Sequence, residues 1–181
     1  MRLEPIKSPS SLLLKIAYFM SKRQFGKVLS PLLVIYSRST PIFQVALKII
    51  SADKKLSISR DTNLLIRNYV SHLNDCKFCA NAIEYVSEKE KWDLKRLNDL
   101  FNFRNSTNYS ENEKTVLDYV EQISLTKTVT QETFDKLKTF FNEKQIVEIT
   151  WVCASENYFN MQAKPLGFSS DNLKLPKNIN Q

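Results

Sequence analysis

The sequence predicts an all-α protein of about nine helices, and three observations support that prediction. Apolar residues recur at the three- and four-residue spacing of a helix face along most of the 181 residues. Capping residues precede several of these segments, most clearly Ser110 and Glu113, which form a capping box. Glycine is scarce, with only Gly26 and Gly167, so tight β-hairpins and the glycine-rich loop of a dinucleotide fold are both disfavoured.

The first third of the chain predicts an irregular arm, residues 1–9, and three helices whose ends are marked by turn and cap residues. Gly26 follows the first helix. Pro31 lies in the first turn of the second, where proline is tolerated, and Thr40 starts the third. The polar residues 51–55 predict a loop after the third helix.

The remaining helices follow from apolar stripes and caps. The fourth carries Leu65, Tyr69 and Leu73 at the spacing of a buried face, and Asp75 is the expected N-cap of the fifth. Residues 102–109 are polar and predict a loop. The expected helices cover residues 11–23, 28–36, 40–50, 57–73, 76–87 and 91–101, with a seventh from Ser110, an eighth from Thr130 and a ninth over 143–164.

Charge is distributed unevenly along the chain. The net charge is +7, but residues 1–60 hold 11 Lys/Arg and only two acids, a net charge of +9, whereas residues 61–181 carry −2. We interpret the basic third as a solvated surface, with nucleic acid, anionic lipid or an acidic partner protein as alternatives. Nucleic acid is disfavoured, because the aromatic residues in this third fall on helix stripes.

The length and composition indicate a single soluble domain. No composition shift requires a second domain, so we expect one domain over residues 1–181, with residues 1–56 as a helical extension on a core of residues 57–170. The start of the chain lacks the features of a signal peptide, and no stretch approaches the roughly 20 apolar residues that span a bilayer. We therefore expect a cytoplasmic protein without a membrane span.

The cysteines point to redox chemistry. Cys76, Cys79 and Cys153 are an odd number with one close CxxC pair, unlike a secreted disulfide framework. If Asp75 caps the fifth helix, Cys76 stands at its first position, more open to solvent than Cys79 one turn further in. Free backbone N–H groups, the helix dipole and the charge of Lys77 then favour a thiolate, and the spacing allows an intramolecular disulfide. The pair supplies an attacking and a resolving thiol.

Other interpretations of these residues remain open. The CxxC is also compatible with half of a zinc site, for which the chain offers Cys153 and His72 besides acids, or with two unreactive core residues. His72, the only histidine, is a candidate base or hydrogen-bond partner for the cysteines, or a helical side chain with no such role. Cys153 follows Ile146 and Ile149 on an apolar stripe and is expected to be buried. We expect neither a bound metal nor a cofactor.

Three blocks of sequence resemble the carboxymuconolactone decarboxylase / alkyl hydroperoxidase D family. Residues 64–79 match its helix, break and CxxC helix, Arg2-Leu-Glu-Pro5 matches its opening, and Asn157-Tyr-Phe-Asn160 with Leu166-Gly167 matches its closing helix and stop. The blocks stand in the family's order and cover most of the chain. The resemblance implies an alkyl hydroperoxidase D-like multi-helix bundle with the CxxC at a helix N-terminus, assembled as dimers, trimers or hexamers.

The resemblance also implies an activity. The family's decarboxylases lack the CxxC, and its peroxidase branch has it. This chain resembles the second group, which implies a thiol-dependent peroxidase or disulfide oxidoreductase that cycles a Cys76–Cys79 disulfide. Its substrate would be a peroxide or a disulfide, and its reductant a dithiol such as a lipoyl-bearing protein. By position, Cys79 corresponds to the peroxide-attacking thiol and Cys76 to the resolving thiol.

The sequence departs from the family at its proton relay. Leu64 stands at the family's glutamate position, Ile83 at its histidine position, and Phe78 where some members have a second histidine. General acid–base help is typically worth about 100-fold to 10,000-fold, so we expect weakened peroxidase activity or a substitute relay. The alternative is a non-catalytic, redox-sensing or protein-binding member of the family. The nearest candidates for a substitute relay are His72, Asp75, Asn68 and Glu84.

Overall fold

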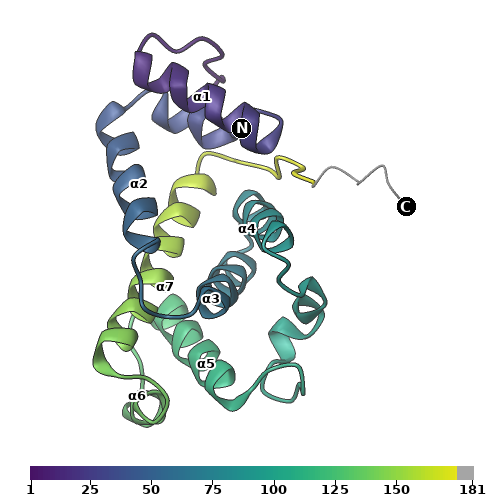
Figure 1. Ribbon diagram of the computed structural model, residues 1–181, viewed down its shortest axis with the longest axis vertical. Helices are drawn as coiled ribbons and strands as arrows, with labels where there is room; N and C mark the ends of the chain where they lie inside the picture. The colour runs from purple at the N-terminus through teal and green to yellow at the C-terminus, as the bar shows by residue number, and fades with distance from the viewer. Residues whose placement is uncertain (175–181) are drawn as a thin grey trace.

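The computed structural model describes residues 1–174, and in that range every regular element is a helix, which confirms the all-α prediction (Figure 1). No helix in residues 1–174 has the length and apolar character needed to cross a membrane. The elements are α1 (Leu12–Phe25), η1 (Leu32–Tyr36), α2 (Thr40–Asp53), α3 (Arg60–Leu73), α4 (Lys77–Lys89), η2 (Leu94–Asn102), α5 (Glu111–Thr126), α6 (Gln131–Lys138) and α7 (Glu143–Ala163).

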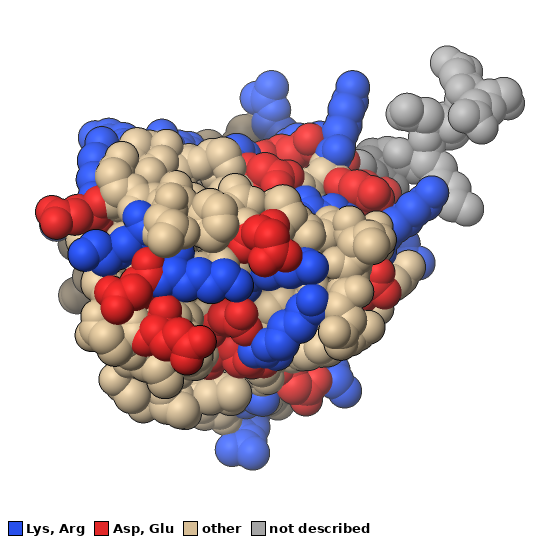
Figure 2. Space-filling model, turned by 90° about the horizontal axis from the view of Figure 1, so that it is seen from below, with Lys and Arg blue, Asp and Glu red and all other residues tan. Residues whose placement is uncertain are grey.

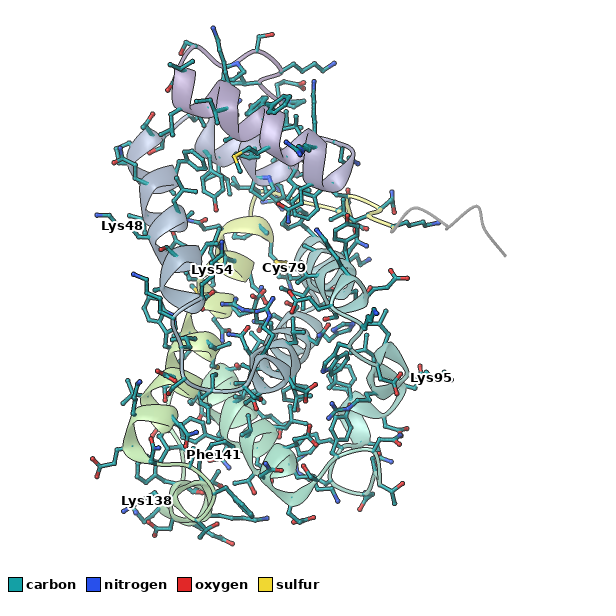
Figure 3. All side chains as sticks on the ribbon, viewed as in Figure 1. Lys48, Lys54, Cys79, Lys95, Lys138 and Phe141 are labelled. Carbon is teal, nitrogen blue, oxygen red and sulfur yellow. A yellow bond between two sulfur atoms is a disulfide. The ribbon has the colours of Figure 1, made fainter. Side chains whose placement is uncertain are left out.

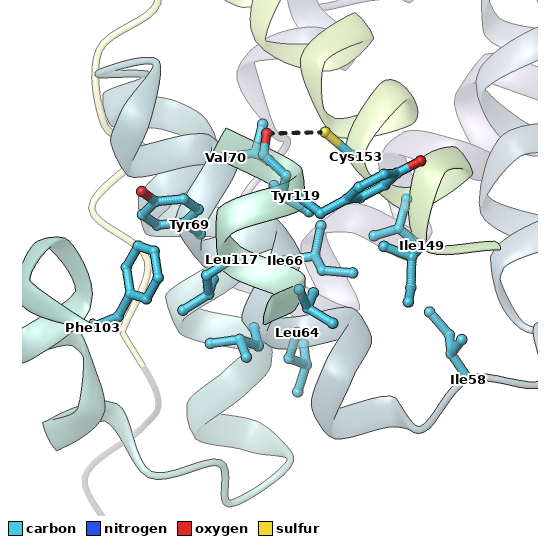
Figure 4. Close-up of a cluster of buried hydrophobic side chains, with 14 of the residues drawn as sticks. Ile58, Leu64, Ile66, Tyr69, Val70, Phe103, Leu117, Tyr119, Ile149 and Cys153 are labelled. Atoms are coloured by element: carbon cyan, nitrogen blue, oxygen red, sulfur yellow. Dashed lines mark hydrogen bonds between the residues drawn. The ribbon is translucent and has the colours of Figure 1, made fainter. Parts of the chain in front are cut away.

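Helix α3 is the central element of the fold. Every residue from Asn63 to Ser71 is buried, because α4, α5 and α7 pack around it (Figure 1). The predicted stripe is confirmed at Leu65 and Tyr69, both fully buried, and at Leu73, which packs against the edge of the core. Figure 4 shows part of this main core, where Ile66 of α3 meets Leu117 of α5 and Ile149 of α7.

The N-terminal elements α1, η1 and α2 form a smaller cluster of their own. Tyr36 and Phe43 are the aromatic centre of this cluster, and Phe159 of α7 packs against it. At the far end of α2, Asp53 accepts a hydrogen bond from Trp151 and pairs with Arg67 of α3. The basic third of the chain is therefore attached to the core at both ends of α2.

Several element boundaries differ from the prediction. The expected loop at 51–55 is wrong in its first half, because α2 continues through Asp53 with no glycine or proline to stop it. The second helix is reduced to η1, a short π-helical segment, and the sixth is the 3₁₀ helix η2. The capping box at Ser110 and the N-cap at Thr130 are confirmed.

Asp75 does not cap α4, and that prediction is wrong. It ends α3 instead: its φ is 47°, its N–H donates to His72 O at 2.9 Å, and the Cys76 N–H donates to Ser71 O at 2.9 Å. These two bonds are the pattern of a Schellman motif, which needs a left-handed residue just beyond the helix end. Asparagine and aspartate tolerate that conformation better than most residues, so Asp75 takes the place that glycine usually fills. The residue at the N-cap of α4 is Cys76.

Candidate redox site

The structure joins Cys76 and Cys79 in a disulfide at the start of α4. Their Cα atoms are 5.2 Å apart, within the usual range for a disulfide. Cys76 is the N-cap residue of α4, and Cys79 lies three residues later in the first turn of the helix, so the disulfide closes about one helical turn. Figure 3 shows Cys79 between α4 and α7, beneath the N-terminal helices.

Both cysteines are buried, with exposures of 3% for Cys76 and 4% for Cys79. The expectation that Cys76 is the more open of the two is therefore wrong. The physical reason is an apolar cover supplied by distant parts of the chain. Val34 of η1, Ala163 at the end of α7 and Phe168 beyond it pack around the pair.

Polar bonds hold this cover in place. Asp171 accepts from the Ser30 N–H at 2.9 Å and from Ser30 Oγ at 2.6 Å, which ties the C-terminal segment to the residues just before η1. Leu173 exchanges hydrogen bonds with the Asn81 side chain of α4. In Figure 1 the same segment runs between α1 and α4. The opening and closing blocks of the resemblance also meet here, because the Arg2 N–H donates to Leu166 O at 2.8 Å.

Two opposing effects act on the thiols that reduction of this disulfide would produce. The free N–H groups and dipole at the N-terminus of α4, together with the exposed side chain of Lys77, favour a thiolate. The apolar surroundings of Val34, Phe78 and Phe168 favour the neutral thiol.

His72 lies on the last turn of α3 and contacts groups other than the cysteines. Its Nε2 is 3.0 Å from Glu84 Oε1, and its Nδ1 is 2.8 Å from Asn68 O. The hydrogen bond with Glu84 raises the pKa of His72 above its usual value, against the opposing effect of partial burial. Glu84 is five residues beyond Cys79, about 140° round the helix, so this pair faces away from the Cys79 side of α4. A direct role for His72 stays a prediction.

Two of the positions where the family carries its relay residues lie in apolar surroundings. Leu64 is buried in the main core and Phe78 lies in the cover, edge-on to Phe168 with ring centroids 5.9 Å apart. Asn68 is fully buried, and its Nδ2 donates to Leu64 O and Ser87 Oγ. Of the candidates for a substitute relay, His72 and Glu84 pair with each other, the Asn68 side chain bonds other groups, and Asp75 is exposed.

A buried polar network beneath the α3–α4 turn escaped sequence reasoning. Glu156 of α7 accepts from Ser71 Oγ at 2.8 Å and from Asn160 at 2.9 Å, and Asn74 donates to Asn160 at 2.9 Å. These bonds fix the turn that presents Cys76. The available signal was that Glu156 and Asn160, four residues apart, continue the line of the apolar residues Ile149, Val152 and Cys153 on α7.

Cys153 is separate from the pair. It is fully buried in the main core, near Val120 and Ser124, which confirms the expectation for it. Burial raises the pKa of its thiol. Because Cys153 and the CxxC pair belong to different apolar clusters, the structure does not bring the three sulfurs together as a zinc site requires. In residues 1–174 no three potential metal-ligating side chains converge.

Comparison of the amino-acid sequence with known proteins gives a relative but no family profile. No protein-family profile matches the chain. The uncharacterized protein YdfG of Bacillus subtilis (strain 168) is 28% identical over 116 residues, which are 63% of this chain and 79% of YdfG.

Solved structures match over more of the chain. An uncharacterized peroxidase-related protein from Silicibacter sp. TM1040 has a TM-score of 0.81 at 17% identity, covering 94% of this chain and 92% of that one. A putative antioxidant defence protein AhpD from Agrobacterium tumefaciens has a TM-score of 0.69 at 22% identity, covering 75% and 94%. The debrominase Bmp8 has a TM-score of 0.78 at 17% identity, covering 93% and 91%. The chain therefore has the fold of AhpD-like, peroxidase-related proteins.

Proposed function

We propose that this protein is a thiol-dependent oxidoreductase that reduces a peroxide and cycles the Cys76–Cys79 disulfide. The observation that supports the proposal most directly is the disulfide itself, placed at the N-terminus of α4 in an AhpD-like fold. A disulfide across one helical turn constrains few residues, so a reversible chemical role accounts for it better than a stabilising one.

The cycle balances as follows. The Cys79 thiolate attacks the terminal oxygen of a hydroperoxide, the O–O bond breaks, and the alcohol leaves after taking up a proton. Cys79 is then a sulfenic acid. The Cys76 sulfur attacks it, which forms the disulfide and releases water. A dithiol reductant returns two electrons and two protons by thiol–disulfide exchange, and becomes a disulfide itself.

The weak point of this cycle is proton delivery. The leaving alkoxide needs a proton, and Leu64, Phe78 and Ile83 cannot donate one. We therefore propose slow turnover, with solvent entering when the apolar cover opens. A lipoyl-type dithiol fits as reductant, because a small exposed dithiol reaches a recessed disulfide more easily than a folded protein surface does. A cytoplasmic location would keep such dithiols reduced. Assembly as a homo-oligomer stays part of the proposal.

The test is a single-turnover and steady-state assay with three matched variants. Cys76→Ser and Cys79→Ser should each abolish hydroperoxide-dependent oxidation of dihydrolipoamide, because neither variant can form the disulfide. Cys153→Ala, which removes the third sulfur from the main core, should retain the wild-type rate per folded molecule. Unchanged turnover in either CxxC variant would refute the mechanism.

The burial of the pair favours a second candidate, a redox-responsive binding protein without turnover. In that case the disulfide would form and break slowly, and its state would alter how Val34 and Phe168 cover α4. The rate of dithiol oxidation distinguishes the two candidate functions. The binding protein would show no catalysis at saturating dithiol, with a change in circular dichroism or assembly on reduction. At 17% identity, the likeness to the debrominase Bmp8 is evidence for the fold alone, so no dehalogenation is proposed.

A further inference from the structure

Helix α1 has apolar residues on two opposite sides. One side, with Leu14, faces the N-terminal cluster and is buried. On the other side, Leu12, Ile16, Phe19 and Met20 are 72%, 49%, 65% and 60% exposed. Their spacing places them along one face of the helix. Four large apolar side chains in a row on a free helix face are more than the scattered exposure that soluble proteins normally show.

Three lysines lie beside this face. Lys7, Lys15 and Lys22 surround a hollow of about 350 Å³, whose wall includes the exposed ring of Phe19. All three lysines are exposed, and none takes part in an ion pair within residues 1–174. The hollow therefore presents unneutralised positive charge next to protruding apolar groups. We call Lys7, Lys15, Lys22 and the four exposed apolar residues the α1 surface.

The α1 surface differs in charge from the opposite end of the molecule. Glu4 is the only acid in the first 52 residues. Figure 2 views the molecule from the end away from α1 and shows acidic and basic side chains mixed there. Figure 1 shows α1 at the far end of the molecule from α6, so the α1 surface lies at an outer end.

We propose that the α1 surface binds the surface of an anionic lipid membrane. The apolar side chains would enter the boundary between headgroups and acyl chains, and the lysines would contact lipid phosphates, as in interfacial amphipathic helices. At 14 residues, α1 is too short to cross a bilayer and would lie along it. Docking here would bring η1, which covers the cysteines, close to the membrane, because Tyr18 Oη donates to Leu32 O at 3.1 Å.

Other occupants fit these observations less well. A second copy of the chain would meet the α1 surface with the same three lysines, so a symmetric contact would place like charges together. Nucleic acid offers phosphates but no apolar layer for Leu12, Phe19 and Met20. A membrane offers negative charge and an apolar layer side by side, in the arrangement that the α1 surface presents.

The test is sedimentation of the full chain with vesicles of phosphatidylcholine alone and of phosphatidylcholine mixed with phosphatidylglycerol. The wild type should bind the anionic vesicles and lose affinity as salt increases. Each lysine near an anionic surface contributes about fivefold, so the triple variant Lys7→Ala, Lys15→Ala, Lys22→Ala should lose roughly 100-fold. Phe19→Ser should lower the affinity for the vesicles about tenfold, because the variant no longer buries a phenylalanine ring in the membrane.

Matched controls remove the same groups elsewhere. The triple variant Lys89→Ala, Lys95→Ala, Lys138→Ala and the single variant Phe140→Ser change exposed residues away from α1 and should bind as the wild type does. Equal losses in the α1 and control variants, or no binding by the wild type, would overturn the proposal. So would self-association that Phe19→Ser abolishes without any vesicle binding. A Cys76→Ser, Cys79→Ser variant should bind normally, which separates this result from the proposed redox function.

Discussion

Replacing Arg67 with methionine should destabilise the protein by about 3–5 kcal/mol, the usual loss when one partner of a buried ion pair is removed. The Arg67 side chain is 7% exposed and lies 2.7 Å from Glu156, whose side chain is 3% exposed. It also pairs with Asp53 and donates to Asn63 at 3.2 Å. Methionine keeps much of the apolar volume but leaves a buried carboxylate without its cation. Hydrogen bonds from Ser71 and Asn160 remain on Glu156, which favours the lower part of that range.

Urea unfolding followed by circular dichroism measures this loss, with the slope of the transition as a check on two-state behaviour. The matched control is Arg104→Met. Arg104 is half exposed and pairs with Asp118 and Glu121, so its removal should change stability by about 1 kcal/mol or less. Adding Glu156→Gln to Arg67→Met should recover part of the stability, because the amide carries no charge and its oxygen can still accept from Ser71 and Asn160. A loss below about 1 kcal/mol for Arg67→Met, or no recovery in the double variant, would refute this account of the network.

Two further predictions concern the titration of His72 and the accessibility of the thiols. In NMR spectra His72 should titrate above its usual pKa, and Glu84→Gln should lower that pKa. Because the pKa of His72 is higher in the folded protein than in the unfolded chain, its pairing with Glu84 stabilises the fold fully below the unfolded pKa. This contribution to the free energy of unfolding is lost as the pH rises through the folded pKa. No effect of Glu84→Gln on the titration would contradict the pairing. In the oxidised protein, a thiol-labelling reagent should modify no cysteine under native conditions and one cysteine after denaturation. Of the three cysteines, Cys153 alone is outside the disulfide, and it is buried. Rapid native labelling would contradict that burial.

The local structure was largely predictable from the sequence. Stripes such as Leu65 and Tyr69 predicted the buried face of α3, and the capping box at Ser110 fixed the start of α5. The prediction failed at Asp75, where one residue is suited both to starting a helix and to ending one. Its positive φ belongs to the Schellman motif that ends α3, in which the Asp75 N–H donates to His72 O and the Cys76 N–H donates to Ser71 O.

Neighbouring residues were enough to predict helices over residues 1–174 and a CxxC pair at the start of one of them, although the cap there is Cys76 and not Asp75. The cover of Val34 and Phe168 over the two cysteines, and the contact of His72 with Glu84, could not be predicted in this way. Burial depends on contacts between segments far apart in sequence, and helical periodicity specifies which face is apolar without specifying what covers it.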